Sequence, residues 1–310
     1  MAGSFDNGLI PLYTTQFSTN LELLLQQRGS MLRGRVREGF HVGKMASPIN
    51  QVGSVTMRQP RGRFAPLERQ DAEYVRRWVF PQEGDLTQMV DTFDELQTIV
   101  DPKSALTEAA AYATGRAWDD CIIANATGTA QLGQDAAGLT SETFSTTNFQ
   151  IAATFGAASA SGLTVAKFIE AKRILRHYHN QLEVDPPCMV IGSQQESDLL
   201  NQVEVVSTEF ADRPMLVDGR VKRFLGFDIV VMERLPQTTV NTTRGVLCFV
   251  KSGVYLGMWK DLTNNIDPRV DLTGRPWQIY TMAMFGATRL QPGKVLQILC
   301  ADTTGADITP

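Results

Sequence analysis

The fold of this chain is decided by the stretch Arg58-Gln59-Pro60-Arg61-Gly62-Arg63-Phe64-Ala65-Pro66. Proline and glycine interrupt helices and strands, so the stretch indicates a turn, and we place it at the tip of a long hairpin-like loop. The surrounding residues 45–80 are polar and rich in arginine. Such a segment has little apolar surface with which to build a core of its own. It therefore has to lie against something else, and a second copy of the chain is the simplest candidate.

The segments on both sides of this loop carry periodic patterns. Residues 15–32 have the spacing of an amphipathic helix, whose apolar stripe includes Phe17, Leu21, Leu24 and Leu25. Residues 51–58 alternate as a strand does. The chain returns from the loop through the aromatic residues Tyr74, Trp78 and Phe80. The predicted helix has an apolar face that needs a cover.

Charge is distributed unevenly along the 310 residues. Residues 1–80 hold 11 Lys/Arg against 6 Asp/Glu, whereas residues 81–310 hold 18 against 27, which gives about +5 and −9. A basic leading region meets either nucleic acid or an acidic protein surface. Arginine pairs well with carboxylates and with phosphates. Because the arginines lack the interleaved aromatic residues of single-strand binders, pairing with the acidic remainder of the chain is the favoured interpretation.

A long helix is the strongest local signal. Asp101 is a good N-cap and Pro102 suits the first helical position, and alanine-rich sequence follows as far as Thr127. About 25 residues at 1.5 Å each would span roughly 37 Å. The patterns further on predict a Gly/Thr-rich loop over 128–162, a helix capped by Thr164, a strand over 188–191, a short helix over 193–200, a strand over 224–231, and strands over 246–250, 254–259, 277–289 and 294–300. The predicted class is α+β with mostly antiparallel strands.

The sequence contains no recognisable motif for catalysis, cofactor binding or metal binding. The glycine spacing of residues 128–135 lacks the lysine of a phosphate-binding loop. His177 and His179 are two apart and so point to different helix faces. Asp119 and Asp120 are expected to be surface charges or ion-pair partners. We therefore expect no enzyme, no catalytic, cofactor-binding or metal-binding residues and no cofactor, and no window reaches the ~20 apolar residues of a membrane span.

Four local stretches and the order of the elements resemble one protein family. They are Phe17-Ser18-Thr19-Asn20-Leu21-Glu22-Leu23-Leu24-Leu25-Gln26-Gln27, Ala117-Trp118-Asp119-Asp120-Cys121-Ile122-Ile123-Ala124-Asn125-Ala126, Arg223-Phe224-Leu225-Gly226-Phe227-Asp228-Ile229-Val230 and Phe285-Gly286-Ala287-Thr288-Arg289. Together they are similar to the major capsid proteins of tailed bacteriophages, which have the HK97-like fold.

The resemblance implies a division of the chain into four parts. Residues 1–44 would be an N-terminal arm, and 45–95 an extended E-loop with its return strand. A peripheral P-domain with a long spine helix would comprise 96–181 and 251–292, and an axial A-domain 182–250 and 293–303. The expected contacts between subunits are Phe17, Leu21, Leu24, Leu25, Arg28, Arg33 and Arg35 in the arm, and Arg58, Arg61, Arg63, Phe64 and Arg69 in the loop.

The same resemblance implies a structural role. The chain would assemble with itself, as hexamers and pentamers, into an icosahedral shell around the phage genome. Its expected partners are a portal, separate scaffolding or decoration proteins, and packaged DNA bound on the inner face without sequence specificity. We expect no coiled-coil scaffolding segment before the arm, so that scaffolding would come from a separate protein or not be needed. The expected location is the virion, after assembly in the bacterial cytoplasm. Two alternatives stay open: a cargo-enclosing compartment shell of the same fold, and a nucleic-acid-binding protein that uses the basic N-terminal region.

Overall fold

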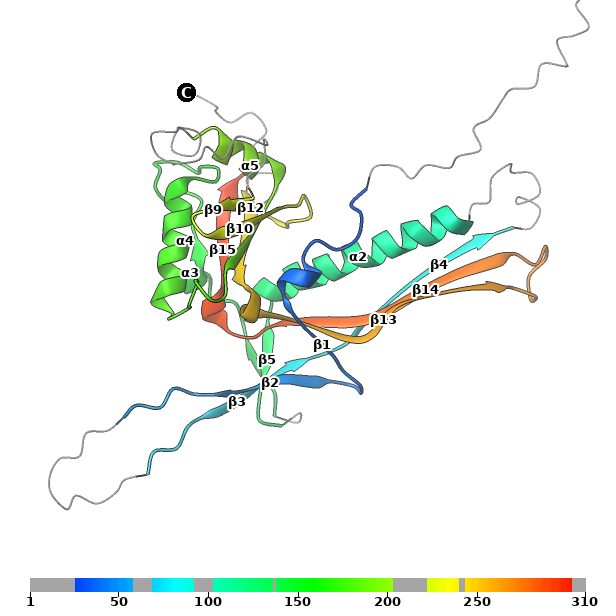
Figure 1. The fold of residues 1–310 in the computed structure, drawn as a ribbon, viewed down its shortest axis with the longest axis horizontal. Helices are drawn as coiled ribbons and strands as arrows, with labels where there is room; N and C mark the ends of the chain where they lie inside the picture. The colour runs from blue at the N-terminus through cyan, green and yellow to red at the C-terminus, as the bar shows by residue number, and fades with distance from the viewer. Residues whose placement is uncertain are drawn as a thin grey trace, which may run out of the picture.

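A computed structural model describes residues 26–57, 69–91, 103–135, 138–202, 222–239 and 243–302. These residues form three sheets, one long helix and three shorter helices (Figure 1). A compact unit lies at one end of the long helix α2 (Lys103–Thr127), a strand ribbon runs along that helix, and a separate hairpin projects away from both. The predicted α+β class is confirmed, and most strand pairs are antiparallel, as expected.

The compact unit is built on a seven-stranded sheet. Its strands, in the order β7-β15-β12-β8-β10-β9 with β11 beside β12, are β7 (Gln150–Ile151), β15 (Val295–Ala301), β12 (Thr243–Val250), β8 (Pro187–Ile191), β10 (Phe227–Val231), β9 (Arg223–Phe224) and β11 (Gln237–Thr239). Every residue of β8 is buried, which explains its unbroken apolar sequence. The helices of this unit are α3 (Thr146–Phe149), α4 (Val165–His177) and α5 (Ser193–Leu200).

The long ribbon is a four-stranded sheet in the order β1-β13-β14-β4. Its strands are β1 (Arg37–Phe40), β13 (Val254–Pro268), β14 (Trp277–Arg289) and β4 (Gln82–Val90). α2 packs along this sheet, and the C-terminal half of the helix carries most of its fully buried apolar residues, among them Ile122 and Ala126. The predicted length of this helix, about 25 residues, is confirmed.

The projecting hairpin belongs to a third sheet in the order β2-β3-β5-β6. Its strands are β2 (Ala46–Val52), β3 (Tyr74–Val79), β5 (Ala130–Leu132) and β6 (Thr140–Glu142). β2 and β3 pair antiparallel and point away from the ribbon (Figure 1). The residues of the predicted loop tip, 58–66, lie outside the described residues, whereas the predicted return through Tyr74 and Trp78 is confirmed.

Two elements predicted near the N-terminus end at different residues in the structure than in the prediction. The predicted helix does not reach residue 32, because residues 26–32 have no helical structure. The backbone N–H groups of Met31 and Leu32 donate instead to a carboxylate on α2, as described below. The predicted strand over 51–58 ends at Val52, since pairing with β3 stops at the Val52–Tyr74 pair.

Three predictions in the compact unit also need correction. The single strand predicted over 224–231 is a hairpin, because Leu225 and Gly226 have φ angles of 49° and 90°, which reverse the chain. The apolar spacing of the sequence predicts that Val165, Phe168, Ile169, Ile174 and Leu175 mark the buried face of α4, but Ile169 is exposed, whereas Lys167 is fully buried. Thr164 occupies the N-cap of α4, but its side chain makes no capping hydrogen bond; the Val165 N–H donates to Gln202 Oε1 at 2.9 Å instead.

Candidate assembly interface

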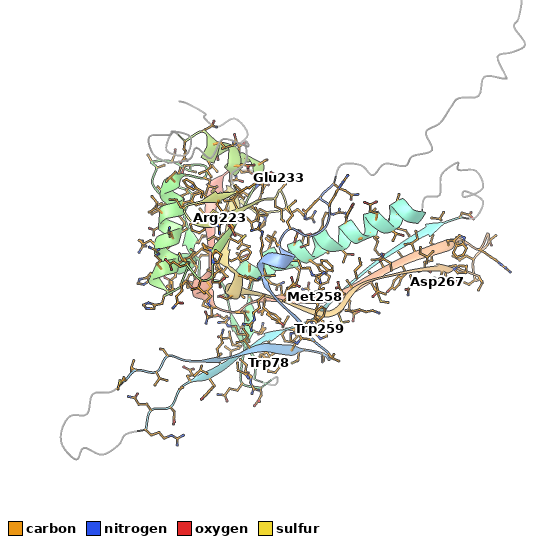
Figure 2. All side chains as sticks on the ribbon, viewed as in Figure 1. Trp78, Arg223, Glu233, Met258, Trp259 and Asp267 are labelled. Atoms are coloured by element: carbon orange, nitrogen blue, oxygen red, sulfur yellow. The ribbon has the colours of Figure 1, made fainter. Side chains whose placement is uncertain are left out.

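The base of the projecting hairpin is held by two buried arginines. Arg77 on β3 places Nη1 2.6 Å from Glu142 Oε2, although this oxygen accepts no well-directed hydrogen bond. Arg77 also donates to the carbonyl oxygen of Arg289 at 3.2 Å. Trp78, beside it at the base of the hairpin (Figure 2), donates from Nε1 to the carbonyl oxygen of Gly133 at 3.1 Å. Arg76 and Arg77 both lie in β3, within the predicted loop and return strand, but Arg77 is buried whereas Arg76 is exposed.

Arg289 joins this base to the end of α2. Its guanidinium donates to the carbonyl oxygens of Ala126 and Gly128 at 3.0 and 2.9 Å, which satisfies carbonyls that helix geometry leaves without partners. It also donates to the carbonyl oxygen of Glu142 at 3.3 Å and lies over the Phe144 ring. Burial lowers the pKa of Arg289, the nearby Arg77 cation adds to that effect, and Glu142 opposes it. The base of the hairpin is thereby connected to the end of α2 through hydrogen bonds.

Beyond its base the hairpin exposes apolar side chains. Val52, Val55 and Tyr74 are each about three-fifths exposed, and Met57 is 99% exposed. A groove of about 470 Å³ runs beside them, lined by Asn50, Val52, Tyr74, Val75, Arg76, Gln134 and Asp135. Exposed apolar groups gathered on a projecting element are typical of a protein–protein contact.

The first described residues lie across α2 and converge on one carboxylate. Asp119 is 0% exposed and accepts four hydrogen bonds, from Gln27 Nε2 at 2.6 Å, Ser30 Oγ at 2.5 Å, Met31 N at 3.0 Å and Leu32 N at 3.1 Å. The expectation that Asp119 is a surface charge or ion-pair partner is wrong, because these donors replace water. The same expectation is correct for Asp120, which pairs with Arg234.

Arg33 and Arg35, predicted contacts between subunits, form ion pairs within the chain. Arg33 lies 3.1 Å from Asp261 and 3.4 Å from Glu38, and its guanidinium stacks 4.4 Å from the centre of a Trp118 ring. Partial burial lowers the pKa of Arg33, but the two carboxylates raise it overall. Arg35 lies 3.9 Å from Asp228. Both arginines keep exposed surface, so contact with another subunit stays a prediction.

The other predicted contact residues are only partly visible. Arg28 is exposed, and Arg69 is exposed beside Asp71, at 2.6 Å. Eight lie outside the described residues: Phe17, Leu21, Leu24, Leu25, Arg58, Arg61, Arg63 and Phe64. Sequence reasoning missed Asp119, Glu142 and Arg289. A charged residue inside an apolar strand, as at position 289, was the available signal.

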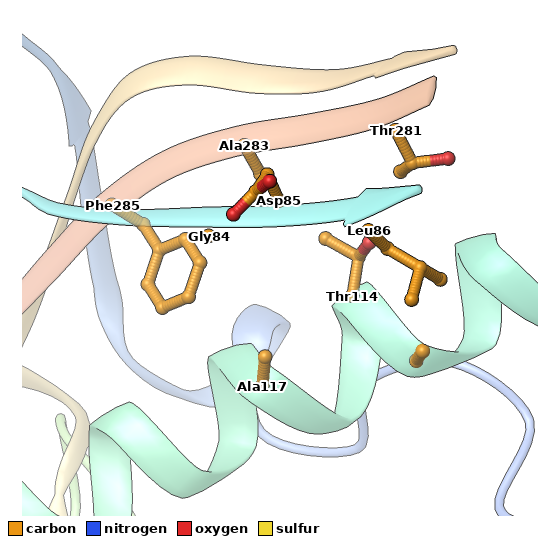
Figure 3. Close-up of a pocket in the computed structure, with 9 residues that line it drawn as sticks. Gly84, Asp85, Leu86, Thr114, Ala117, Thr281, Ala283 and Phe285 are labelled. Carbon is orange, nitrogen blue, oxygen red and sulfur yellow. The ribbon is translucent and has the colours of Figure 1, made fainter. Parts of the chain in front are cut away.

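A small cavity separates α2 from the ribbon (Figure 3). Its volume is about 180 Å³, and it is lined by Gly84, Asp85, Leu86, Ala113, Thr114, Ala117, Thr281, Ala283 and Phe285. It is smaller than the roughly 300–1,000 Å³ of ordinary small-molecule sites. Small side chains on the two facing surfaces account for the gap. Within the described residues, no cluster of metal-ligating side chains occurs, and no helix combines the length and hydrophobicity that a bilayer crossing requires.

Comparison with known families gives the arrangement a context. Residues 9–302 match the family described as phage capsid protein. The chain belongs to this family. The predicted resemblance is thus confirmed over nearly the whole capsid protein. Membership in a structural family also agrees with the expectation that the capsid protein is not an enzyme.

Solved structures resemble the capsid protein in fold at low sequence identity. The capsid of cyanophage P-SCSP1u is 15% identical with a TM-score of 0.73, covering 97% of this chain and 96% of that chain. The capsid of cyanophage Pam1 is 11% identical with a TM-score of 0.71, covering 96% and 98%. The capsid of Ralstonia phage GP4 is 9% identical with a TM-score of 0.68, covering 99% and 100%. Among curated proteins, none matches in sequence.

Proposed function

We propose that this capsid protein is the major shell subunit of a tailed phage, and that hexamers and pentamers of it close into an icosahedral shell around the genome. The observation that carries the proposal is the family match together with a hairpin that exposes apolar side chains away from its own core. Portal, scaffolding or decoration proteins and packaged DNA are the proposed partners. The proposed site of assembly is the bacterial cytoplasm, and the finished protein resides in the virion.

The proposed parts follow the described elements. We assign residues 1–44 to the N-terminal arm and 45–95 to the E-loop with its return strand, which includes β2, β3 and β4. The P-domain would comprise 96–181 and 251–292, with α2 as the spine helix. The A-domain would comprise 182–250 and 293–303. Support comes from the separation of ribbon, compact unit and hairpin in Figure 1, although α4 and β7 of the assigned P-domain pack with the compact unit.

Assembly itself is the first test. The purified protein is expected to form closed shells, or hexamers and pentamers that become shells, because the exposed apolar side chains of the hairpin, Val52, Val55, Met57 and Tyr74, offer contact area to a second subunit. Negative-stain electron microscopy and sedimentation velocity measure this. A stable monomer over a wide range of protein concentrations would contradict the proposal.

The loop arginines give a second test. Arg61→Glu combined with Arg63→Glu is expected to weaken assembly, because the acidic surplus after residue 80 would face these arginines from a neighbouring subunit. A single exposed ion pair contributes only about 0–1 kcal/mol, but the shell repeats it in every subunit. High salt should weaken wild-type assembly in the same direction.

The matched control for this pair is Arg61→Lys with Arg63→Lys, which keeps both charges and should leave assembly largely intact. Shell yield and shell stability against salt are the measured quantities. If the glutamate variant forms empty shells of normal stability that hold no DNA, these arginines bind the genome and the inter-subunit interpretation of the loop is wrong.

A further inference from the structure

Residues 26–31 are attached to α2 mainly by polar contacts, and Leu32 after them is buried in the apolar core. Arg116 Nη1 donates to Gln26 Oε1 at 2.9 Å and to the Gln27 carbonyl oxygen at 3.1 Å. One turn further along the helix, Asp119 accepts its four hydrogen bonds, two of them from backbone N–H groups. We call residues 26–32 the strap. One stretch of α2, residues 115–119, therefore holds the whole strap.

Two glycines allow the strap to lie directly on the helix. A Cβ atom at Gly115 would stand 2.5 Å from the carbonyl carbon of Gly29 and 2.6 Å from the backbone nitrogen of Ser30. Gly29 has a φ of +72°, in the left-handed region that favours glycine. No side chain separates the two backbones at this crossing. This close approach sets how near the strap lies to the helix axis and which strap residues lie opposite Gly115.

The strap is anchored unequally at its two ends. Leu32 is fully buried, and Val36 after it lies in the same apolar core. Before Leu32, by contrast, Arg28 is exposed and Met31 is 42% exposed. Residues 26–31 thus bury little apolar surface, and hydrogen bonds exchanged for water contribute less than buried apolar groups do. Leu32 is therefore the apolar anchor of the strap.

We propose that Gly115 and Asp119 are positioning residues, which form a polar latch that sets the course of the chain where residues 1–25 join the subunit. The latch opens at residues 26–31 without unfolding the remainder. The proposal rests on the proposed shell function, because an arm that contacts neighbouring subunits must leave its own subunit in a defined direction. The latch consists of the buried Asp119 carboxylate, whose four hydrogen-bond donors all come from the strap.

Gly115→Ala in the full-length protein tests the latch. Alanine favours a helix more than glycine does, so a residue that served α2 alone would raise the melting temperature and leave the strap in place. A latch instead predicts displacement of the strap by the new methyl group. Trypsin should then cleave the unassembled protein after Arg28 about tenfold faster, as followed by mass spectrometry, with no fall in melting temperature. Shell yield should fall sharply.

The matched control is Thr114→Ala, one position away on α2 and facing the cavity of Figure 3 rather than the strap. It should retain slow cleavage and normal shells. Asp119→Asn is the second variant, because its amide group would face the Gln27 and Met31 donors. Like Gly115→Ala, it should speed cleavage after Arg28 and lower the shell yield. If Gly115→Ala fails to fold, the Asp119→Asn result alone tests the latch.

The outcomes separate the two proposals. Slow cleavage after Arg28 in both latch variants, or fast cleavage with normal shells, would overturn the latch. If the wild-type protein forms no shells under any condition, the proposed function fails, while the cleavage comparison still decides whether the latch exists.

Discussion

Replacing Arg289 with methionine is expected to lower the free energy of unfolding by about 3 kcal/mol or more, because buried acceptors lose their donor. Arg289 is fully buried and donates to three carbonyl oxygens, those of Ala126, Gly128 and Glu142. Methionine fills much of the same space but donates nothing. The C-terminal carbonyls of α2 would then be buried without partners. Urea unfolding of the unassembled subunit, followed by tryptophan fluorescence, measures the change.

The matched control for this substitution is Arg269→Met. Arg269 pairs with Asp271 and Gln278 at the far end of the ribbon, where water replaces lost contacts. We expect its unfolding free energy to stay nearly unchanged. Equal losses in the two variants would show that the buried network at the base of the hairpin contributes nothing special. In the Arg289 variant, the hairpin should also become more accessible to protease, since β3 reaches the core through the same network.

The second large effect is expected from Leu21→Asp combined with Leu24→Asp, which should abolish assembly. Both leucines lie outside the described residues, and the argument rests on their helical spacing with Phe17 and Leu25. Each side chain contributes about 1.5–3 kcal/mol when fully buried, against a neighbouring subunit or the underside of α2. The far-UV circular dichroism of the subunit should remain nearly unchanged. Electron microscopy of the purified variant measures the outcome.

The control for this pair is Thr15→Asp with Thr19→Asp, which adds the same charge on the helix face opposite the apolar stripe. It should assemble. Normal shells from the leucine variant would refute the burial of the stripe, and failure of both variants would attribute the effect to added negative charge in the arm.

The sequence alone was sufficient for the elements whose signals are local. An N-cap, a proline and continuous alanine-rich sequence identified α2, and apolar runs identified β8, β12, β14, β15 and the first part of β13, whereas β1, β4, β7 and β11 were not predicted. The order of these elements, with four short stretches, was enough to indicate the capsid family over nearly the whole chain. Local propensity and periodicity act between near neighbours, which is why they can be recognised without a structure.

Tertiary structure alone decided where the charged residues lie. Asp119 and Asp120 are adjacent and chemically identical, yet Asp119 is fully buried under the strap and Asp120 pairs with Arg234. Arg77 and Arg289 are 212 positions apart and meet only where β3, β14 and the end of α2 converge. The desolvation of a charge depends on distant segments that surround it, and no local pattern records which segments those are. The sequence therefore determined the elements and the family, whereas the fold determined the latch on α2 and the buried base of the hairpin.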